Sequence, residues 1–445
     1  MKSDIHTIKP LVPQLSVTAL TFARHAGKVV RIQGAIHRTR ALGGVTFVIV
    51  RDREDLIQAV LNRADTKVDE GDLNEGNQVI IEGTVHEDKR APNGAEVRIK
   101  TLTVVGRVKE EAPVVLSHPT LDVHLETNLS YRPVTLRHPT ERAIFRLQAA
   151  IAQQFRAFLS IQGFTEIFTP KIVAAGAEGG ANIFSVPYFK QKAYLTQSPQ
   201  LYKQMMVGVF ERVFEVGHVY RAEQHNTSRH LNEYISLDFE MGFIDSMEDM
   251  MGVEVAYLKS LMEVLKKEHS RELELLSTKL PVVTEIPAVK LHEGIALIRD
   301  HFGYKSPSEH DLDQKGEQLL CEYAQREYGS EFIFVTHYPR PKRPFYAMDD
   351  PENPALTLSF DLLLRGLEVT TGGQRIHDYA AQVKKMKEWK LNPKNFEHYL
   401  MAHRNGLPPH GGLAIGLERL VTRLLGLPNV RQGTLFPRDI DRLTP

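Results

Sequence analysis

Five short runs rich in β-branched residues fall within residues 28–105 and constrain the fold more than any other feature of the sequence. Gly, Asp and Asn residues separate these runs, as turns separate strands. The predicted strands are residues 28–37, 46–52, 56–61, 78–87 and 95–105. Five such strands suit a small closed barrel, often an OB-fold with an open face for single-stranded nucleic acid or oligosaccharide. An unrelated small β-domain is the alternative.

The sequence after the barrel predicts a larger domain of a different kind. Residues 141–162 place apolar side chains at helical spacing, and Gly163 ends this amphipathic helix. Residues 164–172 read as a strand that breaks at Pro170. The strands and helices that follow lack the regular βαβ alternation of a parallel sheet. We therefore expect an α+β domain in which helices flank an antiparallel sheet.

The length of 445 residues favours two domains over one. The expected domains are an OB-fold domain at 1–107, a hinge or linker at 108–140 and a catalytic domain at 141–445. Residues 245–350 hold few motifs, so we interpret them as scaffold with a modest insertion. Helical stretches are expected there at about 247–268 and 308–327.

Composition excludes several classes of protein. The net charge is zero, so a nucleic acid partner would have to bind local basic patches. Cys321 is the only cysteine, which rules out a disulfide framework or a thiolate zinc cluster within one chain. No run approaches the length of apolar sequence that a membrane span requires, and the N-terminus lacks the apolar core of a signal peptide. We expect a cytoplasmic protein.

Two stretches hold candidate phosphate ligands, although the sequence has no P-loop and no dinucleotide fingerprint. Residues 219–243 predict two strands joined by a polar loop that bears Arg221, Arg229 and His230. Guanidinium groups bind phosphate oxygens in a planar, bidentate way. Residues 411–427 predict a Gly-rich strand that leads into a helix, whose N-terminus favours anions. A solvated basic loop and plain strand-to-helix packing are the alternatives.

Together these stretches resemble motifs two and three of the class II aminoacyl-tRNA synthetases, and residues 163–170 resemble motif one. The three occur in the expected order, and the resemblance covers nearly the whole chain. It is greatest to the aspartyl-tRNA synthetases of the archaeal and eukaryotic-like type. The resemblance implies ATP-dependent activation of L-aspartate, its transfer to tRNA(Asp), and a homodimer that motif one helps to form.

The resemblance assigns ATP-binding and metal-binding roles. Arg221 and Arg419 are the implied catalytic residues, which grip the α- and γ-phosphates. Glu368 and Thr371 are the implied ligands of Mg²⁺, although relatives commonly have serine in place of Thr371. The implied ATP-binding set is Arg221, Ala222, Glu223, Arg229, His230, Leu231, Glu368, Gly416, Leu417, Glu418 and Arg419.

The resemblance also assigns an aspartate pocket. Its implied residues are Glu178, Ser198, Gln200, Leu201, Tyr202, Lys203, Asp238, Thr371 and Arg375. Lys203 and Arg375 supply cations for the side-chain carboxylate, and Glu178 and Asp238 supply acidity for the α-ammonium group. A neutral asparagine side chain would leave a buried cation uncompensated, which favours aspartate. The Gly-rich segment 176–182 around Glu178 is a candidate lid.

In the barrel, the resemblance implies that Phe47, Gln58 and Glu96 read the anticodon by stacking and hydrogen bonding. Core packing is the alternative for Phe47. His37 and Pro92 match a pair that accompanies relaxed recognition of both tRNA(Asp) and tRNA(Asn), although Arg90 also aligns near Pro92. Two alternatives remain: an asparagine-specific ligase, and a silent RNA-binding paralogue. The second typically lacks the phosphate-gripping arginines that are present here.

Overall fold

The structure is a computed structural model that describes residues 17–174 and 182–445. The chain divides into two compact units. The barrel unit runs to His124 and includes Pro133–Pro139, and the large unit comprises Leu125–Arg132 and Thr140–Pro445. No helix among the described residues is long and apolar enough to cross a membrane.

Five strands of the barrel unit close into a barrel in the order β1-β2-β3-β5-β4, which confirms the predicted OB-fold barrel. They are β1 (Val29–Leu42), β2 (Val45–Arg51), β3 (Leu56–Asn62), β4 (Gln78–Glu87) and β5 (Ala95–Gly106), with short 3₁₀ helices η1 (Phe22–His25), η2 (Glu70–Leu73) and η3 (Pro92–Gly94). Alternate residues of each strand fill the core, as Val48 and Val50 do in β2. β1 is longer than predicted because its exposed end pairs with β2 from Arg38 to Leu42.

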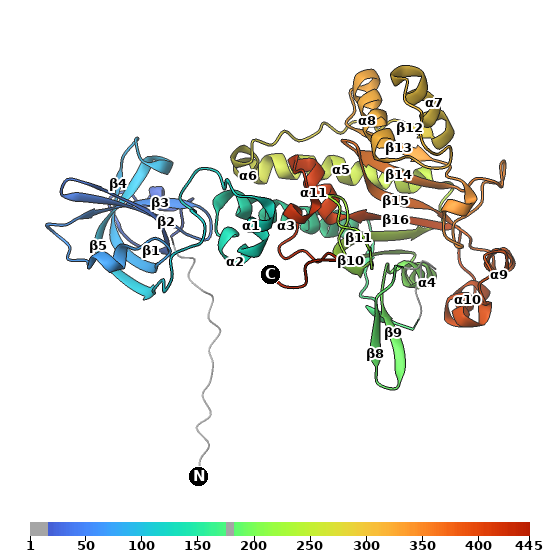
Figure 1. Cartoon of the computed structure of the whole chain (residues 1–445), viewed down its shortest axis with the longest axis horizontal. Coiled ribbons are helices and arrows are strands. Elements are labelled where there is room, and N and C mark those ends of the chain that lie inside the picture. Colours follow the sequence, from blue (N-terminus) through green and yellow to red (C-terminus); the bar gives the residue numbers. More distant parts are fainter. Residues whose placement is uncertain (1–16, 175–181) are drawn as a thin grey trace, which may run out of the picture. The chain divides into compact units, whose positions relative to one another are not determined.

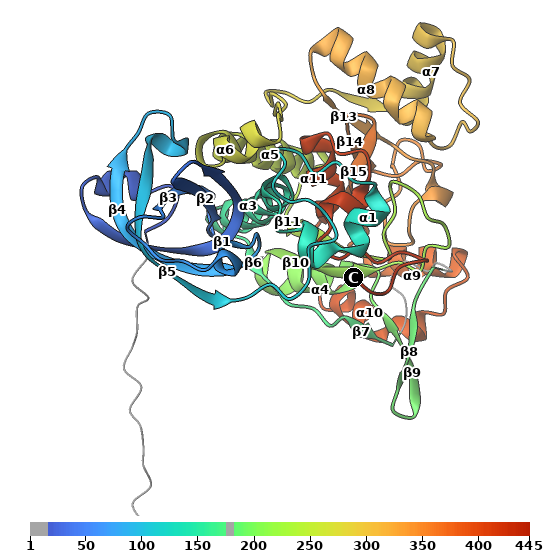
Figure 2. The ribbon, with the colours of Figure 1, turned by 60° about the vertical axis from the view of Figure 1, so that its left-hand side comes forward.

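The large unit contains the predicted antiparallel sheet, with one parallel pair at each edge. Within the described residues, eight strands follow the order β12-β13-β14-β15-β16-β11-β10-β6. They are β6 (Thr165–Glu166), β10 (Arg212–Tyr220), β11 (Glu233–Gly242), β12 (Ala288–Lys290), β13 (Phe332–Thr336), β14 (Ser359–Leu364), β15 (Leu367–Arg375) and β16 (His410–Gly416). A smaller sheet joins β7 (Ile172–Val173), β8 (Ser185–Tyr188) and β9 (Gln191–Leu195). The β8–β9 hairpin projects from the large unit in both views (Figures 1 and 2).

Helices α3, α5 and α11 share one apolar core with the central strands of the large sheet. The described helices from residue 125 onward are α1 (Leu125–Ser130), α2 (Arg132–Thr135), α3 (Pro139–Ile161), α4 (Gln200–Phe210), α5 (Glu248–Glu268), α6 (Ser270–Leu275), α7 (Leu291–Phe302), α8 (Gln314–Tyr328), α9 (Tyr379–Glu388), α10 (Glu397–Arg404) and α11 (Leu417–Leu425), with 3₁₀ helices η4 (Arg340–Lys342), η5 (Pro393–Phe396) and η6 (Val430–Gly433). α3 and α5 agree closely with the predicted helices. Figure 1 shows α5 and α11 against the strands of the sheet.

Residues 288–336, which hold β12, α7, α8 and β13, form what we call the α7–α8 module. It has its own apolar core, built from residues such as Leu320 and Val335, at one edge of the sheet (Figure 2). One local prediction was wrong: residues 164–172 form only the two-residue β6 and the first residue of β7. The span 108–140, expected to be a hinge or linker, contains the short helices α1 and α2.

Candidate active site

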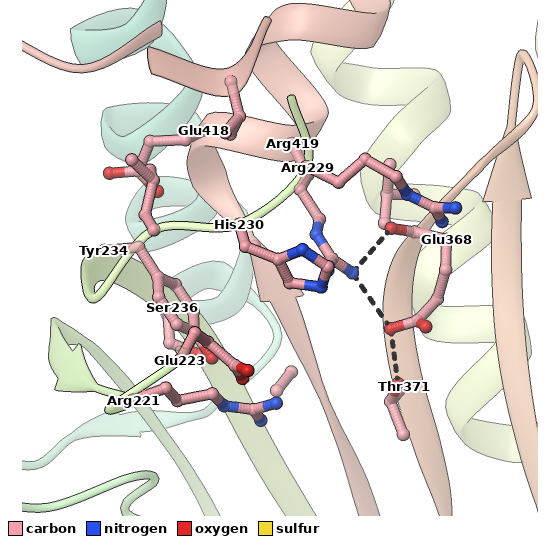
Figure 3. Close-up of a pocket in the computed structure, with 15 residues that line it drawn as sticks. Arg221, Glu223, Arg229, His230, Tyr234, Ser236, Glu368, Thr371, Glu418 and Arg419 are labelled. Atoms are coloured by element: carbon pink, nitrogen blue, oxygen red, sulfur yellow. Dashed lines mark hydrogen bonds and ion pairs between the residues drawn. The ribbon is translucent and has the colours of Figure 1, made fainter. Parts of the chain in front are cut away.

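Two adjoining cavities open on the large sheet and share Arg221, Glu368 and Thr371 in their walls. The smaller has a volume of about 290 Å³ and the larger about 580 Å³. Figure 3 shows the smaller cavity, with Arg221 and Glu223 on one side and Glu368 and Thr371 on the other. We name them after the ligands that the sequence implies: the smaller is the nucleotide cavity and the larger is the amino acid cavity.

The loop between β10 and β11 supplies one wall of the nucleotide cavity. Arg221 follows the last residue of β10, and its backbone N–H donates to the carbonyl of Asn232 at 2.9 Å, where the chain returns into β11. Its guanidinium lies 5.9 Å from the centroid of the Tyr234 ring. Glu223 also lines the cavity and accepts from the amide of Asn182 at 3.2 Å.

Arg229, His230 and Leu231 complete this wall. Arg229 forms a short ion pair with Glu317 of α8. The His230 ring lies 2.7 Å from the Thr227 hydroxyl, and burial together with Arg419 lowers the pKa of His230. A neutral imidazole therefore faces the cavity at neutral pH.

Glu368, Thr371 and Arg419 form the opposite wall as one connected group. The Thr371 hydroxyl donates to Glu368 Oε1 at 3.1 Å, and Arg419 Nη1 donates to the same carboxylate at 3.2 Å (Figure 3). Burial disfavours the charged form of Glu368, but Arg419 and Arg343 outweigh it and hold the pKa of Glu368 below its usual value. The carboxylate is therefore ionised, and its oxygen lies beside the Thr371 hydroxyl.

Gly416 and Glu418 also line the nucleotide cavity, at the N-terminus of α11. The Glu418 carboxylate accepts from the backbone N–H of Ile235 at 3.1 Å, and burial raises its pKa to about 8. Glu418 thus ties α11 to β11. Leu417 is buried in the core, and Ala222 is held by its backbone to Asn182. Neither residue is part of the cavity wall.

In the amino acid cavity, the wall contains Ser198, Gln200, Thr371 and Arg375 from the predicted aspartate set. Ser198 and Gln200 lie at the start of α4, and Arg375 ends β15. Arg375 Nη2 donates to the side chain of Gln200 at 3.3 Å and to the carbonyl of Gly412 at 3.0 Å. The structure therefore brings residues from two segments that lie far apart in the sequence to one wall.

Lys203 and Asp238 lie outside the wall of this cavity, buried to 1% exposure each. Lys203 Nζ donates to Asp238 Oδ1 at 2.9 Å and to the carbonyl of Leu413 at 2.9 Å. It also lies 3.3 Å from Glu240, whose other oxygen accepts from Arg375 Nε at 2.9 Å. Two carboxylates thus already neutralise the two cations.

The remaining aspartate candidates stand apart. Leu201 packs against the apolar cluster that includes Tyr346 and Tyr399. Tyr202 lies on α4 and is not part of the cavity wall. Glu178, with most of the candidate lid, lies outside the described residues.

Sequence reasoning missed three charged residues of the site: Glu240, Asp361 and Arg343. Glu240 is fully buried two residues after Asp238, on the same face of β11. Asp361 pairs in register with Thr371 and forms a 2.8 Å ion pair with Arg343, which lines the amino acid cavity. Acids inside otherwise apolar strands were the available signal for Glu240 and Asp361, because such charges need partners. Arg343 stands in a Pro-rich segment with no such signal.

In the barrel unit, Gln58 and Glu96 are neighbours: the Gln58 amide donates to Glu96 at 3.1 Å. Phe47 alternates with the core residues of β2 and is not part of the barrel core, so it lies on the outer face. The Arg40 guanidinium lies 5.2 Å from its ring centroid. An outward ring removes the core-packing alternative for Phe47.

His37 occupies a β-bulge, where the register between β1 and β2 shifts between Ile36 and Arg38. Its ring nitrogen lies 3.2 Å from Arg51, and burial together with Arg51 lowers the pKa of His37 to about 4. Pro92 begins η3, between β4 and β5. Arg90 forms an exposed ion pair with Asp88 at 2.9 Å.

Comparison with known proteins identifies the family. Residues 124–440 match the class II tRNA synthetases (D, K and N), and residues 30–105 match the OB-fold nucleic acid binding domain. An aspartate–tRNA(Asp/Asn) ligase of Deinococcus radiodurans is 47% identical over 95% of this chain and 97% of its own length. The Thermus thermophilus ligase of the same name is 46% identical, over 95% and 98%. An aspartate–tRNA(Asp) ligase of Pyrococcus abyssi is 37% identical, over 94% and 97%.

Solved structures agree on the fold. Asparaginyl-tRNA synthetase of Pyrococcus horikoshii, complexed with asparaginyl-adenylate, has a TM-score of 0.89 at 30% identity and covers 98% of this chain and 100% of its own. A putative aspartyl-tRNA synthetase of Leishmania major has a TM-score of 0.84 at 30% identity, over 99% and 97%. The family match spans more than half of the chain and the relatives cover almost all of it. The chain therefore belongs to the class II tRNA synthetases of the D, K and N group, a family of amino acid–tRNA ligases that carry an OB-fold anticodon domain.

Proposed function

We propose that the protein is an aspartate–tRNA ligase that activates L-aspartate with ATP and transfers it to tRNA(Asp) and tRNA(Asn). The single observation that carries this proposal is that Arg221 lines both cavities. A phosphate gripped there lies where the nucleotide cavity meets the amino acid cavity. This is the position at which a carboxylate must attack the α-phosphate.

Activation requires positioning and charge neutralisation more than a protein base. The aspartate α-carboxylate forms a bond to the α-phosphorus, and the bond to the β-phosphate oxygen breaks and releases diphosphate. Arg221 and Arg419 offset the charge that develops on the phosphates. Of the rest of the proposed ATP set, the cavity wall contains Glu223, Arg229, His230, Leu231, Gly416 and Glu418, whereas Ala222 and Leu417 lie outside that wall. A hydroxyl of the terminal tRNA ribose then attacks the aspartyl carbonyl and releases AMP.

The oxygen ligands Glu368 and Thr371 fit Mg²⁺, which typically takes one or two protein oxygens and shares phosphate oxygens. Their 3.1 Å hydrogen bond keeps the two groups side by side, which supports this proposal. Such an ion would offset phosphate charge. No group of three or more His, Cys, Asp or Glu side chains suited to a metal occurs among the described residues, so the donor set favours an ion that phosphate helps to hold.

Arg375 is the proposed direct partner of the aspartate side chain, because its guanidinium reaches the cavity wall. Lys203 is proposed to act from behind it, by holding Asp238 and Glu240 in place. Glu178 and Asp238 remain the proposed acidic groups for the α-ammonium. Ser198 and Gln200, which line the cavity with Arg375, belong to the same proposed set, and so do Leu201 and Tyr202, which stand apart from the cavity wall. The relatives that are 47% and 46% identical are aspartate ligases, which supports aspartate over asparagine.

The barrel unit is proposed to be the anticodon-binding domain, within boundaries near 1–107, and 141–445 the catalytic domain after a hinge. An outward Phe47 beside a Gln58–Glu96 pair offers stacking and base-edge hydrogen bonds. His37 and Pro92 are proposed to permit both tRNAs. Since the relatives named tRNA(Asp/Asn) ligases are among the most similar proteins, they support this part. A cytoplasmic setting follows from tRNA as substrate.

A homodimer is also proposed. Exposed apolar side chains gather near motif one, with Ile161 and Phe168 each 83% exposed. Phe210 and Phe243 lie nearby, since Arg212 donates to the carbonyl of Gln162 at 3.4 Å and the Gly242 N–H donates to the carbonyl of Glu211 at 2.9 Å. A second copy of the chain would cover these side chains. Sedimentation across a range of concentrations tests this, and a monomer at every concentration would contradict it.

Amino-acid-dependent exchange of diphosphate into ATP tests the activation step, with aspartate, asparagine and lysine compared because the family includes all three. We expect exchange with aspartate alone. Exchange with asparagine would identify an asparagine enzyme, and exchange with none of the three would favour the silent paralogue.

A further inference from the structure

Helix α8 of the α7–α8 module extends one carboxylate to the back of the nucleotide cavity. Glu317 forms a short charged hydrogen bond with Arg229 Nη2, across 88 positions of sequence. The two side chains retain only 9% and 14% exposure. The module packs around its own core and pairs with β14 through β13, and this contact also joins it to the loop that lines the cavity.

Glu317 holds Arg229 from its far side. Arg229 is part of the cavity wall, whereas Glu317 is not. A guanidinium carries five N–H donors in one plane, so a carboxylate bound at one edge leaves the geometry for a phosphate at another. The contact therefore fixes the orientation of Arg229 without entering the space for ATP.

The charges around Glu317 argue against a purely structural ion pair. Burial raises the pKa of Glu317 to about 7, with Arg229 acting in the opposite direction. Glu368 of β15 and Arg419 and Arg423 of α11 also face it, and the Cys321 thiol lies on its own helix. A buried ion pair contributes little net stability once the loss of hydration is counted. Stability alone does not account for a carboxylate at this position.

We propose that Glu317 is a positioning residue for ATP, which fixes the Arg229 guanidinium at the cavity wall in readiness for phosphate. The inference rests on the proposed function in taking this cavity as the ATP site. It also gives the α7–α8 module a role in the reaction. Glu317 itself touches no substrate.

The test uses the full-length Glu317→Gln variant, which keeps the shape of the side chain and removes its charge. The matched control is Glu331→Gln, because Glu331 forms a similar ion pair with Arg365 at the edge of the same module. Titration calorimetry with ATP and Mg²⁺ measures the Kd, and diphosphate exchange measures KM for ATP and for aspartate. We expect Glu317→Gln to raise the Kd for ATP about tenfold, which is the typical effect of losing a charged hydrogen bond. The Tm should fall, because the change leaves the buried Arg229 guanidinium without its charged partner, whereas KM for aspartate should stay at its wild-type value. The control should leave the Kd for ATP and both KM values unchanged.

A double-mutant cycle shows whether the effect passes through Arg229. We expect Glu317→Gln to add no further loss of ATP affinity to Arg229→Ala, because both changes remove the same oriented guanidinium. Additive losses, unchanged ATP affinity, or tighter binding from release of a competing carboxylate would each overturn the inference. Calorimetry needs no amino acid, so the inference is decided even if aspartate-dependent exchange is absent and the proposed function fails.

Discussion

Glu240 is the buried carboxylate that links Arg375 to Lys203, the two cations assigned to amino acid binding. Its negative charge holds the Arg375 guanidinium at the wall of the amino acid cavity. Because both cations already have carboxylate partners, charge balance alone does not select aspartate. We infer that selectivity depends on how Arg375 is oriented by Glu240 and Gln200.

Replacement of Glu240 by Gln should lower the free energy of unfolding of the large unit by about 3 kcal/mol, because removal of one partner leaves a buried charge uncompensated. Urea unfolding measures the change. Glu211→Gln is the control, since its 3.6 Å pair with Arg212 is exposed and contributes at most about 1 kcal/mol. Equal losses of unfolding free energy in the two variants would contradict the prediction, because the buried Glu240 would then contribute no more than an exposed ion pair.

Glu254 of α5 predicts a pH dependence of stability. Its carboxylate accepts from the Thr370 hydroxyl behind β15, and burial raises its pKa from 4.5 to about 8. Between these values the unfolded chain has released a proton that the folded chain still holds. The free energy of unfolding therefore falls as pH rises through this window.

Glu254→Gln removes this dependence. Its free energy of unfolding relative to wild type should rise between pH 5 and pH 8, by up to about 1.4 kcal/mol per pH unit. Denaturant unfolding at several pH values measures the difference, in which all other titrating groups cancel. Glu263→Gln, on an exposed position of the same helix, should give a flat difference. A flat difference for Glu254→Gln would contradict the prediction.

The site residues that lie inside motifs could be predicted from the sequence. The buried charged residues that hold them in place could not. The expected residues Arg221, Glu368 and Arg419 do line one cavity. The partners of Glu240 and Glu317 could not be assigned from the sequence, because they lie on other strands and loops. Only the fold reveals which charges are paired, and for that reason Lys203 could not be recognised as already compensated.

At the scale of elements, the pairing of β11 with β16 positions both cavities, because Arg375, Asp238 and the start of α11 all depend on it. The strands approach closely at Gly412, where an added Cβ would lie 2.1 Å from the carbonyl oxygen of Phe239 and 2.2 Å from Glu240. The glycines of residues 411–416 therefore serve strand packing as well as the ligand approach that the sequence suggested.

Gly412→Ala should destabilise the large unit by several kcal/mol and abolish diphosphate exchange, since backbone atoms cannot yield to the new methyl group. Gly252→Ala is the opposite case. Gly252 is exposed in α5 with no atom within 4 Å of the added Cβ, so alanine should stabilise the protein by about 1 kcal/mol. Thermal unfolding of both variants checks the pair. Stabilisation by Gly412→Ala would contradict the packing of the sheet described above.

Element boundaries were predicted best where burial alternates. β4 and α5 show a clear period and match their predicted ranges within a residue or so. The exposed end of β1 shows none, since its residues pair with β2 without contributing to the core. α1 and α2 are too short to establish a helical period, so sequence reasoning took them for a linker.

At the scale of the whole molecule, we propose that the barrel unit binds the anticodon and that the large unit catalyses the reaction. Activation of aspartate needs no tRNA, so changes in the barrel should leave it untouched. Diphosphate exchange therefore tests the large unit alone, and aspartylation of tRNA also tests the barrel unit.

Phe47→Ala should raise KM for tRNA about tenfold in aspartylation, because stacking of a base on an aromatic ring contributes about 1–3 kcal/mol. Diphosphate exchange should remain at the wild-type rate. Val48→Ala, a core position of the same strand, is the control for simple destabilisation and should lower the Tm instead. Loss of exchange in Phe47→Ala would argue against independent roles for the units.

The central claim is tested most directly by charging purified tRNA(Asp) and tRNA(Asn) with labelled aspartate or labelled asparagine. Our account predicts that aspartate is attached to both tRNAs at comparable rates and that asparagine is attached to neither. Strong rejection of tRNA(Asn) would contradict the proposed role of His37 and Pro92. Attachment of asparagine to tRNA(Asn) would contradict the assignment of the amino acid cavity.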